Sequence, residues 1–403
     1  MSEKNMYTIL QVHNYYQIPG GEDTVVANEK KILEQNGHKV ITYYRNNSEI
    51  KKMNLLQKLG LPLLFLFNLK TYIEIKKIIR EEKIDIVHVH NTLNLISPAV
   101  YYAAIKMKIP VIQTLHNFRL ICPAATLYRD GKTCEKCLET GLMNSVKYAC
   151  YRNSRLQTLM CVFNLKLHKA IGIYKKINYI YLTEFNRLKM SPFFEIDNER
   201  IYVKPNFSVE CNNIDLNMNQ RKQQYVFVGR LEKIKGIDKL LEAWKVLGTE
   251  APNLIVCGDG PLREWCEKYI QDNHLNTVSL KGQIRHKEVI DVVKSSKALI
   301  FPTQVYEGFP MGMAEAMSCG TPIICSDYGN AGSLVIEGKI GLKFQKDSVI
   351  DLCKTVQCFE KLDEKTRIEF MMNSYLEYTE KYNSKMNLQL LEKIYADVIE
   401  REC

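Results

Sequence analysis

Short apolar runs alternate with helical segments along this chain, and the alternation occurs twice. The first set of runs comprises YTILQV (7–12), KVITYY (39–44), DIVHVH (85–90) and PVIQTL (110–115). The second set comprises YVFVG (225–229), NLIVCG (253–258), TVSLKG (277–282), KALIFP (297–302) and TPIICS (321–326). Strands that alternate with helices form parallel sheets covered by helices on both faces. The sequence therefore predicts an α/β fold with two doubly wound, Rossmann-like domains in series.

The boundary between the two domains is expected near Pro205-Asn206, where a turn-forming pair ends the first periodic region. The polar stretch CNNIDLNMNQRKQQ then separates it from the next strand. We expect an N-terminal domain at 1–205 and a C-terminal domain at 206–383. Residues 384–403 are expected to form an amphipathic helix that packs back on the first domain. Because ligands of doubly wound sheets bind at the carboxyl ends of the strands, the two domains are expected to face a common cleft.

The composition narrows the possible partners. The 403 residues are 46% hydrophobic and 25% charged, which is enough apolar material for two domains and lacks the polar bias of disorder. The formal net charge is +10, and residues 147–189 contain nine Lys or Arg against one acidic residue, Glu184. Such a surface suits phosphorylated substrates or anionic lipid, and a merely solvated basic face is the alternative. No nucleic-acid module accompanies it, so nucleic acid is not an expected partner.

The N-terminal sequence MSEKNMYTIL lacks the regions of a secretory signal, and no stretch reaches the roughly 18 apolar residues that span a bilayer. We therefore expect a cytoplasmic protein. Residues 51–83 combine KKMNLLQKL, LPLLFLFNL and KKIIR, which fits a segment that lies on the inner face of the cell membrane. A helix pair that covers the first sheet is the alternative.

Two glutamates flank a turn in the segment EGFPMGMAEAM. Glu307 follows the strand KALIFP after a short loop, and the next residues, Gly-Phe-Pro, keep it outside a regular helix. From Met311 onward the segment predicts a helix, whose free N–H groups and positive dipole end suit a phosphate or a polar sugar edge. Glu315 lies one turn further in. The two carboxylates are expected to accept hydrogen bonds from hydroxyl pairs of one ligand, and the alternative is two glutamates with no shared ligand.

A second strand-end loop carries two basic side chains. The strand YVFV is followed by Gly229 and the segment RLEKIKG, so Arg230 and Lys235 precede the helix IDKLLEAW. Arg offers a planar fork and Lys a point charge, and together they can neutralise a diphosphate leaving group without a metal. The alternative is a pair of solvated surface cations.

The motifs EGFPMGMAEAMSCGTPII, GRLEKIKG, CGDGPLR and KPNF resemble the C-terminal half of retaining glycosyltransferase family 4, the group 1 glycosyltransferases, whose members have the GT-B fold. The segments PGGEDTVV and TLHNFRLICP resemble the first domain of that family, so the similarity covers nearly the whole chain. The resemblance implies transfer of a sugar from a nucleotide-sugar donor, with retention of the anomeric configuration and with no cofactor or metal required for catalysis. The acceptor would be a glycan or a lipid-linked sugar of bacterial surface polysaccharide synthesis, such as capsule, exopolysaccharide or O-antigen.

Carried over residue by residue, the resemblance implies that Glu315 binds the ribose of the donor and that Glu307 contacts hydroxyls of the transferred sugar. Arg230 and Lys235 would hold the diphosphate. The same resemblance implies donor contacts from the loop and the helix start at Gly229, Phe309, Met311 and Gly312.

The strands of the N-terminal half end in further candidates. His116, at the end of PVIQTL, matches the family's histidine near the reacting sugar, where it would form hydrogen bonds rather than act as a nucleophile. A lone strand-end histidine with a structural role is the alternative. His88 and His90 are expected on opposite faces of their strand. Asn91, beside His90, is expected nearer the cleft and within reach of the acceptor.

Gly20 and Gly21 follow the first strand, where a backbone without side chains lets a phosphate or an acceptor approach closely. A flexible turn is the alternative.

Four cysteines lie in one insert, which includes a Cys-x-x-Cys pair: Cys122, Cys134, Cys137 and Cys150. Four thiolates at such spacings can hold a structural zinc ion, and ordinary reduced thiols are the equally weighted alternative.

A non-enzymatic protein and a phosphorylase are the alternatives to a transferase. A non-enzymatic scaffold or nucleotide-sugar sensor would be expected to lack Arg230, Lys235 or Glu315, and all three are present. A phosphorylase of the same fold would need a lysine that carries a cofactor and a much longer chain. The sequence therefore favours the transferase.

Overall fold

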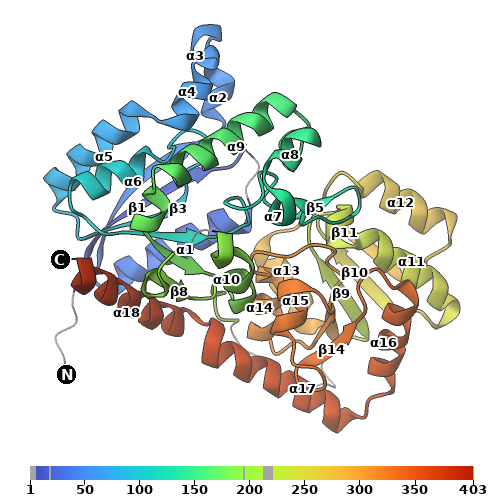
Figure 1. Cartoon of the computed structure of the whole chain (residues 1–403). Coiled ribbons are helices and arrows are strands. Elements are labelled where there is room, and N and C mark those ends of the chain that lie inside the picture. Colours follow the sequence, from blue (N-terminus) through green and yellow to red (C-terminus); the bar gives the residue numbers. More distant parts are fainter. Residues whose placement is uncertain (1–5, 18–19, 194–195, 212–220, 403) are drawn as a thin grey trace. The chain divides into compact units, whose positions relative to one another are not determined.

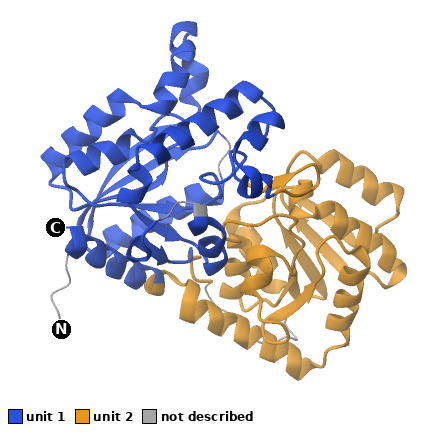
Figure 2. Ribbon diagram, in the orientation of Figure 1, with its two compact units in different colours: residues 1–125, 135–206, 387–403 blue, residues 126–134, 207–386 orange. Residues whose placement is uncertain are grey.

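The computed structural model describes residues 6–17, 20–193, 196–211 and 221–402. The chain divides into two compact units (Figure 2). Unit 1 comprises residues 1–125, 135–206 and 387–403, and unit 2 comprises residues 126–134 and 207–386. The polar stretch expected between the domains lies largely outside the described residues. The sequence did not anticipate that residues 126–134, from the N-terminal half, group with unit 2.

Unit 1 contains a six-stranded parallel sheet in the order β2-β1-β3-β4-β7-β8. Its strands are β1 (Thr8–Tyr15), β2 (Lys39–Asn46), β3 (Ile86–Asn91), β4 (Val111–Leu115), β7 (Asn178–Tyr181) and β8 (Ile201–Val203). Its helices are α1 (Gly21–Gln35), α2 (Glu49–Lys52), α3 (Leu55–Leu59), α4 (Leu61–Leu66), α5 (Leu69–Glu82), α6 (Ala99–Lys106), α7 (Lys136–Thr140), α8 (Met143–Lys147), α9 (Arg155–Ala170), α10 (Glu184–Met190) and, from Asn387 onward, α18 (Ser384–Glu402). Helices α2 to α4 stand out from the body of this unit (Figure 1).

The C-terminal helix α18 completes the core of unit 1. Its apolar side chains, among them Leu391 and Val398, are fully buried. They pack in one cluster with Ile9, Ile86 and Ile112 from three neighbouring strands. An amphipathic helix buries its apolar face wherever a sheet face is left uncovered, and here the last residues of the chain cover the first sheet.

Unit 2 contains a second six-stranded parallel sheet, in the order β11-β10-β9-β12-β13-β14. Its strands are β9 (Gln224–Val228), β10 (Asn253–Cys257), β11 (Val278–Gly282), β12 (Ala298–Phe301), β13 (Ile323–Ser326) and β14 (Gly341–Phe344), with a separate hairpin of β5 (Tyr128–Arg129) and β6 (Lys132–Thr133). Its helices are α11 (Ile237–Leu247), α12 (Arg263–Asp272), α13 (His286–Ser295), α14 (Met311–Ser318), α15 (Gly329–Leu334), α16 (Val349–Lys361) and α17 (Glu364–Glu377). Trp244 of α11 is buried in the core and donates its indole N–H to the carbonyl of Pro252 at 2.8 Å.

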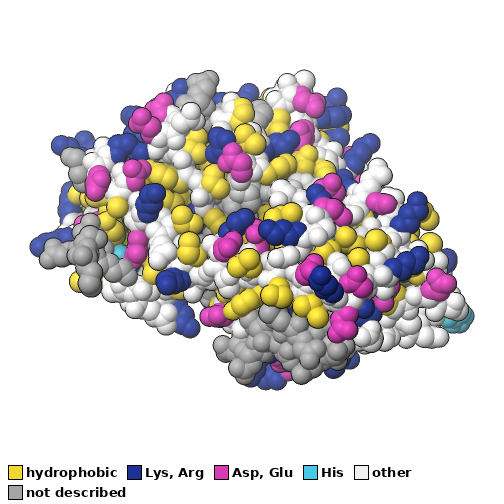
Figure 3. All heavy atoms as spheres, turned by 90° about the horizontal axis from the view of Figure 1, so that it is seen from below, with side chains coloured by type: hydrophobic (Ala, Val, Ile, Leu, Met, Phe, Trp, Pro, Cys, Tyr) yellow, Lys and Arg dark blue, Asp and Glu magenta, His cyan; other side chains and the backbone are white. Residues whose placement is uncertain are grey.

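Charged side chains of both signs are mixed on the face shown in Figure 3, where no area of a single sign stands out. None of the described helices is both long enough and apolar enough to cross a membrane.

Candidate active site

The strand order of unit 2 reverses between β9 and β12, which lie side by side. In a doubly wound sheet the loops that follow two such strands diverge, and the crevice between them is the usual binding site. The loop after β9 carries Arg230 and Lys235, and the loop after β12 carries Glu307. The topology thus places these sequence candidates at the switch point of the second sheet.

Lys235 and Glu307 form an ion pair across this switch point. The Lys235 Nζ lies 2.8 Å from Glu307 Oε1 and 2.9 Å from Oε2, and Thr303 donates its hydroxyl to Oε1 at 2.7 Å. The side chain of Asn330 donates to the backbone carbonyls of Glu307 and Gly308. Both charged groups are therefore held in place before any ligand binds.

A glycine makes this pairing possible. Gly236 has a φ of +73°, and a Cβ there would lie 1.9 Å from the carbonyl oxygen of Pro302 at the end of β12. Only a residue without a side chain allows the two loops to approach so closely. This close approach brings Lys235, the residue before Gly236, to the loop that carries Glu307.

The loop start at Gly229 is equally crowded. A Cβ at Gly258, whose φ is +147°, would lie 1.9 Å from the carbonyl oxygen of Gly229. Arg230, however, pairs with Glu232 at 2.5 Å rather than with Glu307, and half of its side chain is exposed. The structure thus brings Lys235 and Glu307 together and leaves Arg230 in a solvent-facing pair on the same loop.

Helix α14 begins at Met311, as the sequence predicted, and Pro310 precedes it. Phe309 is buried and packs on Tyr382, with the ring centroids 5.7 Å apart. Glu315, one turn into the helix, accepts a hydrogen bond from His286 Nε2 of α13 at 3.0 Å, which raises the pKa of His286. Gly312 lies in the first turn of α14, between the two glutamates.

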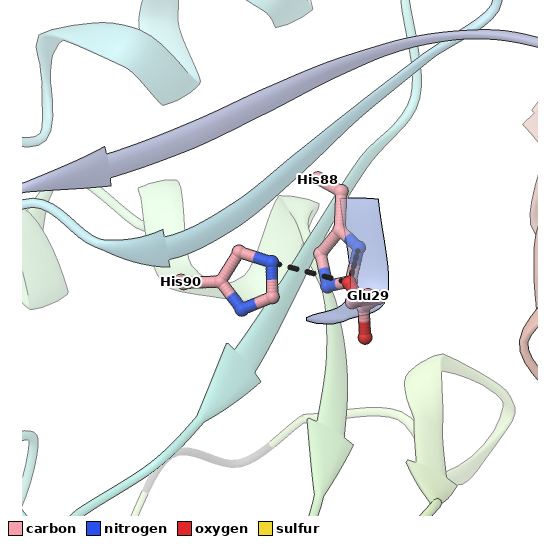
Figure 4. Close-up of side chains that lie close together, drawn as sticks. All are labelled: Glu29, His88 and His90. Atoms are coloured by element: carbon pink, nitrogen blue, oxygen red, sulfur yellow. Dashed lines mark ion pairs between the residues drawn. The ribbon is translucent and has the colours of Figure 1, made fainter. Parts of the chain in front are cut away.

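A buried charge network lies behind the strand ends of unit 1. Glu29 of α1 contacts His88 Nδ1 at 3.1 Å and His90 Nε2 at 3.2 Å, both on β3 (Figure 4). Its second oxygen lies 3.3 Å from the ammonium of Lys204, which also donates to Asn387 of α18 at 3.0 Å. Among the described residues this is the one group of potential metal ligands within reach of each other. A buried ammonium beside the carboxylate opposes a divalent cation, so we interpret the group as a charge network.

The expectation that His88 and His90 point to opposite faces of their strand was wrong. The two rings lie 4.3 Å apart on one face of β3. Side chains alternate with a period of two along a strand, so residues two apart share a face.

His116 follows β4 and receives its orientation from the same network. Its Nε2 lies 3.0 Å from His90 Nδ1, with the rings stacked. Burial, followed by the neighbouring His90, lowers the pKa of His116 well below its ordinary value, so the ring is neutral at neutral pH. His116 and Asn91 line a cavity of about 70 Å³ in unit 1. The amide of Asn91 donates to the carbonyl of Asn14 at 2.8 Å and accepts from the backbone of Leu93, so it shapes the loop after β3.

Gly20 and Gly21 stand at the start of α1, after β1. A Cβ at Gly20 would meet nothing within 4 Å, which leaves open space above this helix N-terminus. The adjacent Glu22 was not singled out from the sequence, although it follows the glycine pair directly. It accepts hydrogen bonds from Tyr16 at 3.3 Å and Asn117 at 3.5 Å, and burial raises its pKa to about 8.

The four cysteines of the insert lie on short elements or in loops. Cys134 groups with unit 2, whereas Cys122, Cys137 and Cys150 group with unit 1. Within the described chain, no group of metal-ligating atoms includes them. The structural zinc therefore stays a prediction.

Family models of known proteins match both halves of the chain. The family model described as "Glycosyl transferases group 1" matches residues 211–375, and the model described as "Glycosyltransferase Family 4" matches residues 19–139. An uncharacterized glycosyltransferase of Methanocaldococcus jannaschii is 25% identical over 97% of this chain and 98% of its own length. An uncharacterized 42.6 kDa protein in the cps region of Klebsiella pneumoniae is 28% identical over 78% of this chain and 79% of its own.

Solved structures share the fold. A glycosyltransferase from Rickettsia africae superposes with a TM-score of 0.72 at 17% identity, over 98% of this chain and 99% of its own. The Anabaena protein HepE, solved with UDP and glucose, superposes with a TM-score of 0.65 at 15% identity, over 97% and 100% of the two chains. Two parallel doubly wound units of this kind make up the GT-B fold. The chain belongs to the group 1 glycosyltransferases, as its motifs indicated.

Proposed function

We propose that this glycosyltransferase moves a sugar from a nucleotide-sugar donor to a lipid-linked glycan acceptor, with retention of configuration. The observation that carries the proposal is the Lys235–Glu307 pair at the switch point of unit 2. The pair sets a fixed cation, suited to a diphosphate, beside a carboxylate that can accept from sugar hydroxyls. The Anabaena relative of known structure was solved with UDP and glucose, which supports a ligand of this class.

The proposed reaction breaks the bond between the anomeric carbon and the phosphate oxygen. The nucleoside diphosphate leaves with the bonding electrons, and Lys235 and Arg230 stabilise its growing negative charge. The acceptor hydroxyl oxygen attacks the anomeric carbon from the face that the diphosphate leaves, and its proton passes to a departing phosphate oxygen. These two side chains supply the positive charge, so the proposed transfer requires no metal, and activity should persist in a chelator.

Release of nucleoside diphosphate from a panel of UDP-, GDP- and ADP-sugars tests the donor half. A crude membrane lipid extract serves as the source of acceptor. We expect release from one donor, stimulated by the extract and reduced about 100-fold in Lys235→Ala, because a preorganised cation is lost. Lys233→Ala is the matched control, since Lys233 lies on the same short helical turn but is exposed.

Equal activity of the two lysine variants would refute the assignment of the pair. If the folded protein bound a nucleotide sugar but released no nucleoside diphosphate with any acceptor, a nucleotide-sugar sensor would explain the protein better than a transferase.

The surface of unit 1 supports a lipid-borne acceptor. Leu55, Leu56, Leu59 and Leu63 on α3 and α4 are 69% to 79% exposed. Helix α4 packs on α9, where Asn164 donates to the carbonyl of Phe65 at 2.7 Å. Helix α9 adds further exposed apolar side chains to this area: Leu156, Leu159 and Phe163. Apolar side chains beside lysines are typical of elements that lie on a membrane surface.

A cavity of about 330 Å³ lies between α4 and α9. Leu61, Phe65 and Met160 give it an apolar floor, and Lys58 and Arg152 line it as well. Phe65 also lines the cavity beside His116, so the two cavities are neighbours in unit 1. An apolar site with two cations suits a lipid phosphate whose attached sugar reaches the His116 cavity.

Flotation with vesicles of anionic phosphatidylglycerol tests this surface. The double variant Leu56→Ser/Leu59→Ser should lose most of its lipid-bound fraction, because two exposed apolar anchors are removed. Val246→Ser, at another exposed apolar side chain, on α11 in unit 2, is the control. Absence of wild-type flotation would favour a soluble acceptor.

We place the reaction in bacterial surface polysaccharide synthesis. The support is the similarity to a protein in the cps region of Klebsiella pneumoniae together with the exposed apolar side chains of α3, α4 and α9. Loss of a surface polysaccharide after gene deletion, restored by the wild type but not by Lys235→Ala, would test this placement.

A further inference from the structure

The carboxylate of Glu29 is ionised although it is fully buried. Burial favours the neutral acid, but the contacts with His88 and Lys204 outweigh it and hold the pKa of Glu29 well below its ordinary value. Both Glu29 and Lys204 have side chains only 1% exposed, and Lys204 is a permanent partner on one carboxylate oxygen. The other oxygen is therefore a fixed acceptor that faces the histidines of β3.

A fixed acceptor on one side determines where the proton of His90 resides. Burial, followed by the neighbouring His88, lowers the pKa of His90 to about 3, so this ring carries a single proton at neutral pH. Its Nε2 lies 3.2 Å from Glu29 Oε1, a buried oxygen that no hydrogen bond of regular geometry from the described residues satisfies, so a ring lone pair on Nε2 would face this negative charge and be repelled. The proton is therefore on Nε2, and Nδ1 of His90 presents a lone pair.

One neighbouring contact favours the opposite tautomer and is weaker. The amide nitrogen of Gln11 lies 3.4 Å from His90 Nε2, and it already donates to the carbonyl of Val26 at 3.3 Å. The hydroxyl of Tyr44 donates to the amide oxygen of Gln11, which sets the orientation of the amide. A neutral hydrogen bond at 3.4 Å is weaker than the repulsion between a carboxylate and a ring lone pair at 3.2 Å in the protein interior.

The position of the proton on His90 in turn determines the tautomer of His116. The lone pair on His90 Nδ1 lies 3.0 Å from His116 Nε2, so His116 must carry its proton on Nε2 and donate it to His90. Its Nδ1 is then unprotonated. Among the described residues, no protein group bonds to this Nδ1, and His116 lines the unit 1 cavity.

We propose that Glu29, held by Lys204, is a positioning residue that fixes His116 through His90 as an imidazole whose Nδ1 only accepts hydrogen bonds. A substrate group placed against it must be a hydroxyl that donates. The statement about the substrate hydroxyl rests on the proposed function, in which a sugar occupies the site. The assignment of the His116 tautomer is independent of that function.

The experiment is histidine-selective ¹⁵N labelling with two-bond nitrogen–proton correlation, which separates protonated from unprotonated ring nitrogens. The chain has only eight histidines, and a His116→Gln sample assigns the signal of His116. We expect His116 of the wild type to be neutral, with the proton on Nε2. A proton on Nδ1 overturns the proposal, whatever any variant does.

Glu29→Gln provides a sharper test. The amide oxygen of the new side chain faces Lys204, which leaves its NH₂ group facing the two histidines. His90 Nε2 then has to accept, and the relay reverses, so that the proton of His116 moves to Nδ1. Glu34→Gln, on the same helix but partly exposed beside Lys30, is the matched control and should change nothing. An unchanged His116 signal in folded Glu29→Gln overturns the proposal.

Kinetics separate this inference from the proposed function. A sugar hydroxyl would meet an N–H in Glu29→Gln, so kcat should fall about tenfold or more. Affinity for nucleoside diphosphate should be unchanged, because unit 2 supplies that site. A merely structural role would lower both together. If the tautomer is as stated but the wild type transfers no sugar, the proposed function fails and the relay stands.

Discussion

Glu22 makes the stability of unit 1 depend on pH in an unusual direction. Its side chain is 10% exposed, and one carboxylate oxygen is buried without a hydrogen-bond partner. Burial is the main cause that raises its pKa from about 4.5 to about 8, and the nearby Asp23 adds to it. The perturbation we consider is Glu22→Gln, which keeps the shape and removes the ionisation.

The direction of this pH dependence follows from the difference between the pKa of Glu22 in the folded and in the unfolded chain. The folded state holds the proton of Glu22 up to about pH 8, whereas the unfolded chain releases it near 4.5. The contribution of the neutral acid to stability is fully present below pH 4.5 and is lost as the pH rises through 8. Such a pKa difference corresponds to at most about 5 kcal/mol. Because Arg119 is nearby and water reaches part of the side chain, we expect about 2 kcal/mol.

Differential scanning calorimetry of the full chain at pH 5, 7 and 9 measures this effect. Both tryptophans, Trp244 and Trp265, lie in unit 2, so a transition without a change in tryptophan fluorescence belongs to unit 1. At pH 9 the unit 1 transition of Glu22→Gln should lie about 5 °C above that of the wild type, and at pH 5 the two should coincide. Glu34→Gln should follow the wild type at every pH. If the melting temperatures of Glu22→Gln and the wild type vary in parallel with pH, the reasoning is refuted.

Three further predictions follow from single contacts. Lys204→Met should destabilise unit 1 by about 3–5 kcal/mol in denaturant titration, because it removes the ammonium that balances the buried carboxylate of Glu29. Adding Glu29→Gln should recover part of this loss, and additive losses would contradict the pairing. Gly236→Ala should lower nucleoside-diphosphate release at least about tenfold in a folded protein, because a Cβ cannot fit 1.9 Å from the Pro302 carbonyl; wild-type activity would show that the loops can separate freely. Purified protein should contain about one zinc ion per chain. Cys137→Ser should lower this zinc content, whereas Cys358→Ser, which changes an exposed thiol, should not. A zinc content below about a tenth of an equivalent in the wild type would exclude the structural zinc.

Most strands were predictable because a fully buried parallel strand is a short apolar run. All nine runs that the sequence analysis selected correspond to strands, from β1 to β4 and from β9 to β13. The strands that were missed are β7, β8 and β14 of the two sheets, with three or four residues each, and β5 and β6 of the hairpin, with two residues each. Runs this short, such as Ile201–Val203 with its partly exposed side chains, give no clear periodicity.

The candidate site was predictable in its members but not in their pairing. Lys235 and Glu307 were both singled out, as a diphosphate ligand and as a sugar ligand, without the ion pair that joins them. Their partners Thr303 and Asn330 carry no signal of their own, because Thr and Asn are common in loops.

The sequence by itself determined the two doubly wound units, the helix start at Met311 and the family, since apolar periodicity and glycine-rich strand-end motifs are local patterns. Only the tertiary structure decided which distant residues meet. Glu29 and Lys204 are 175 positions apart and Lys235 and Glu307 are 72 apart, and each pair forms because of the way the strands are ordered and the last helix is placed. Strand order depends on how whole elements pack, and a local pattern of apolar residues does not encode it.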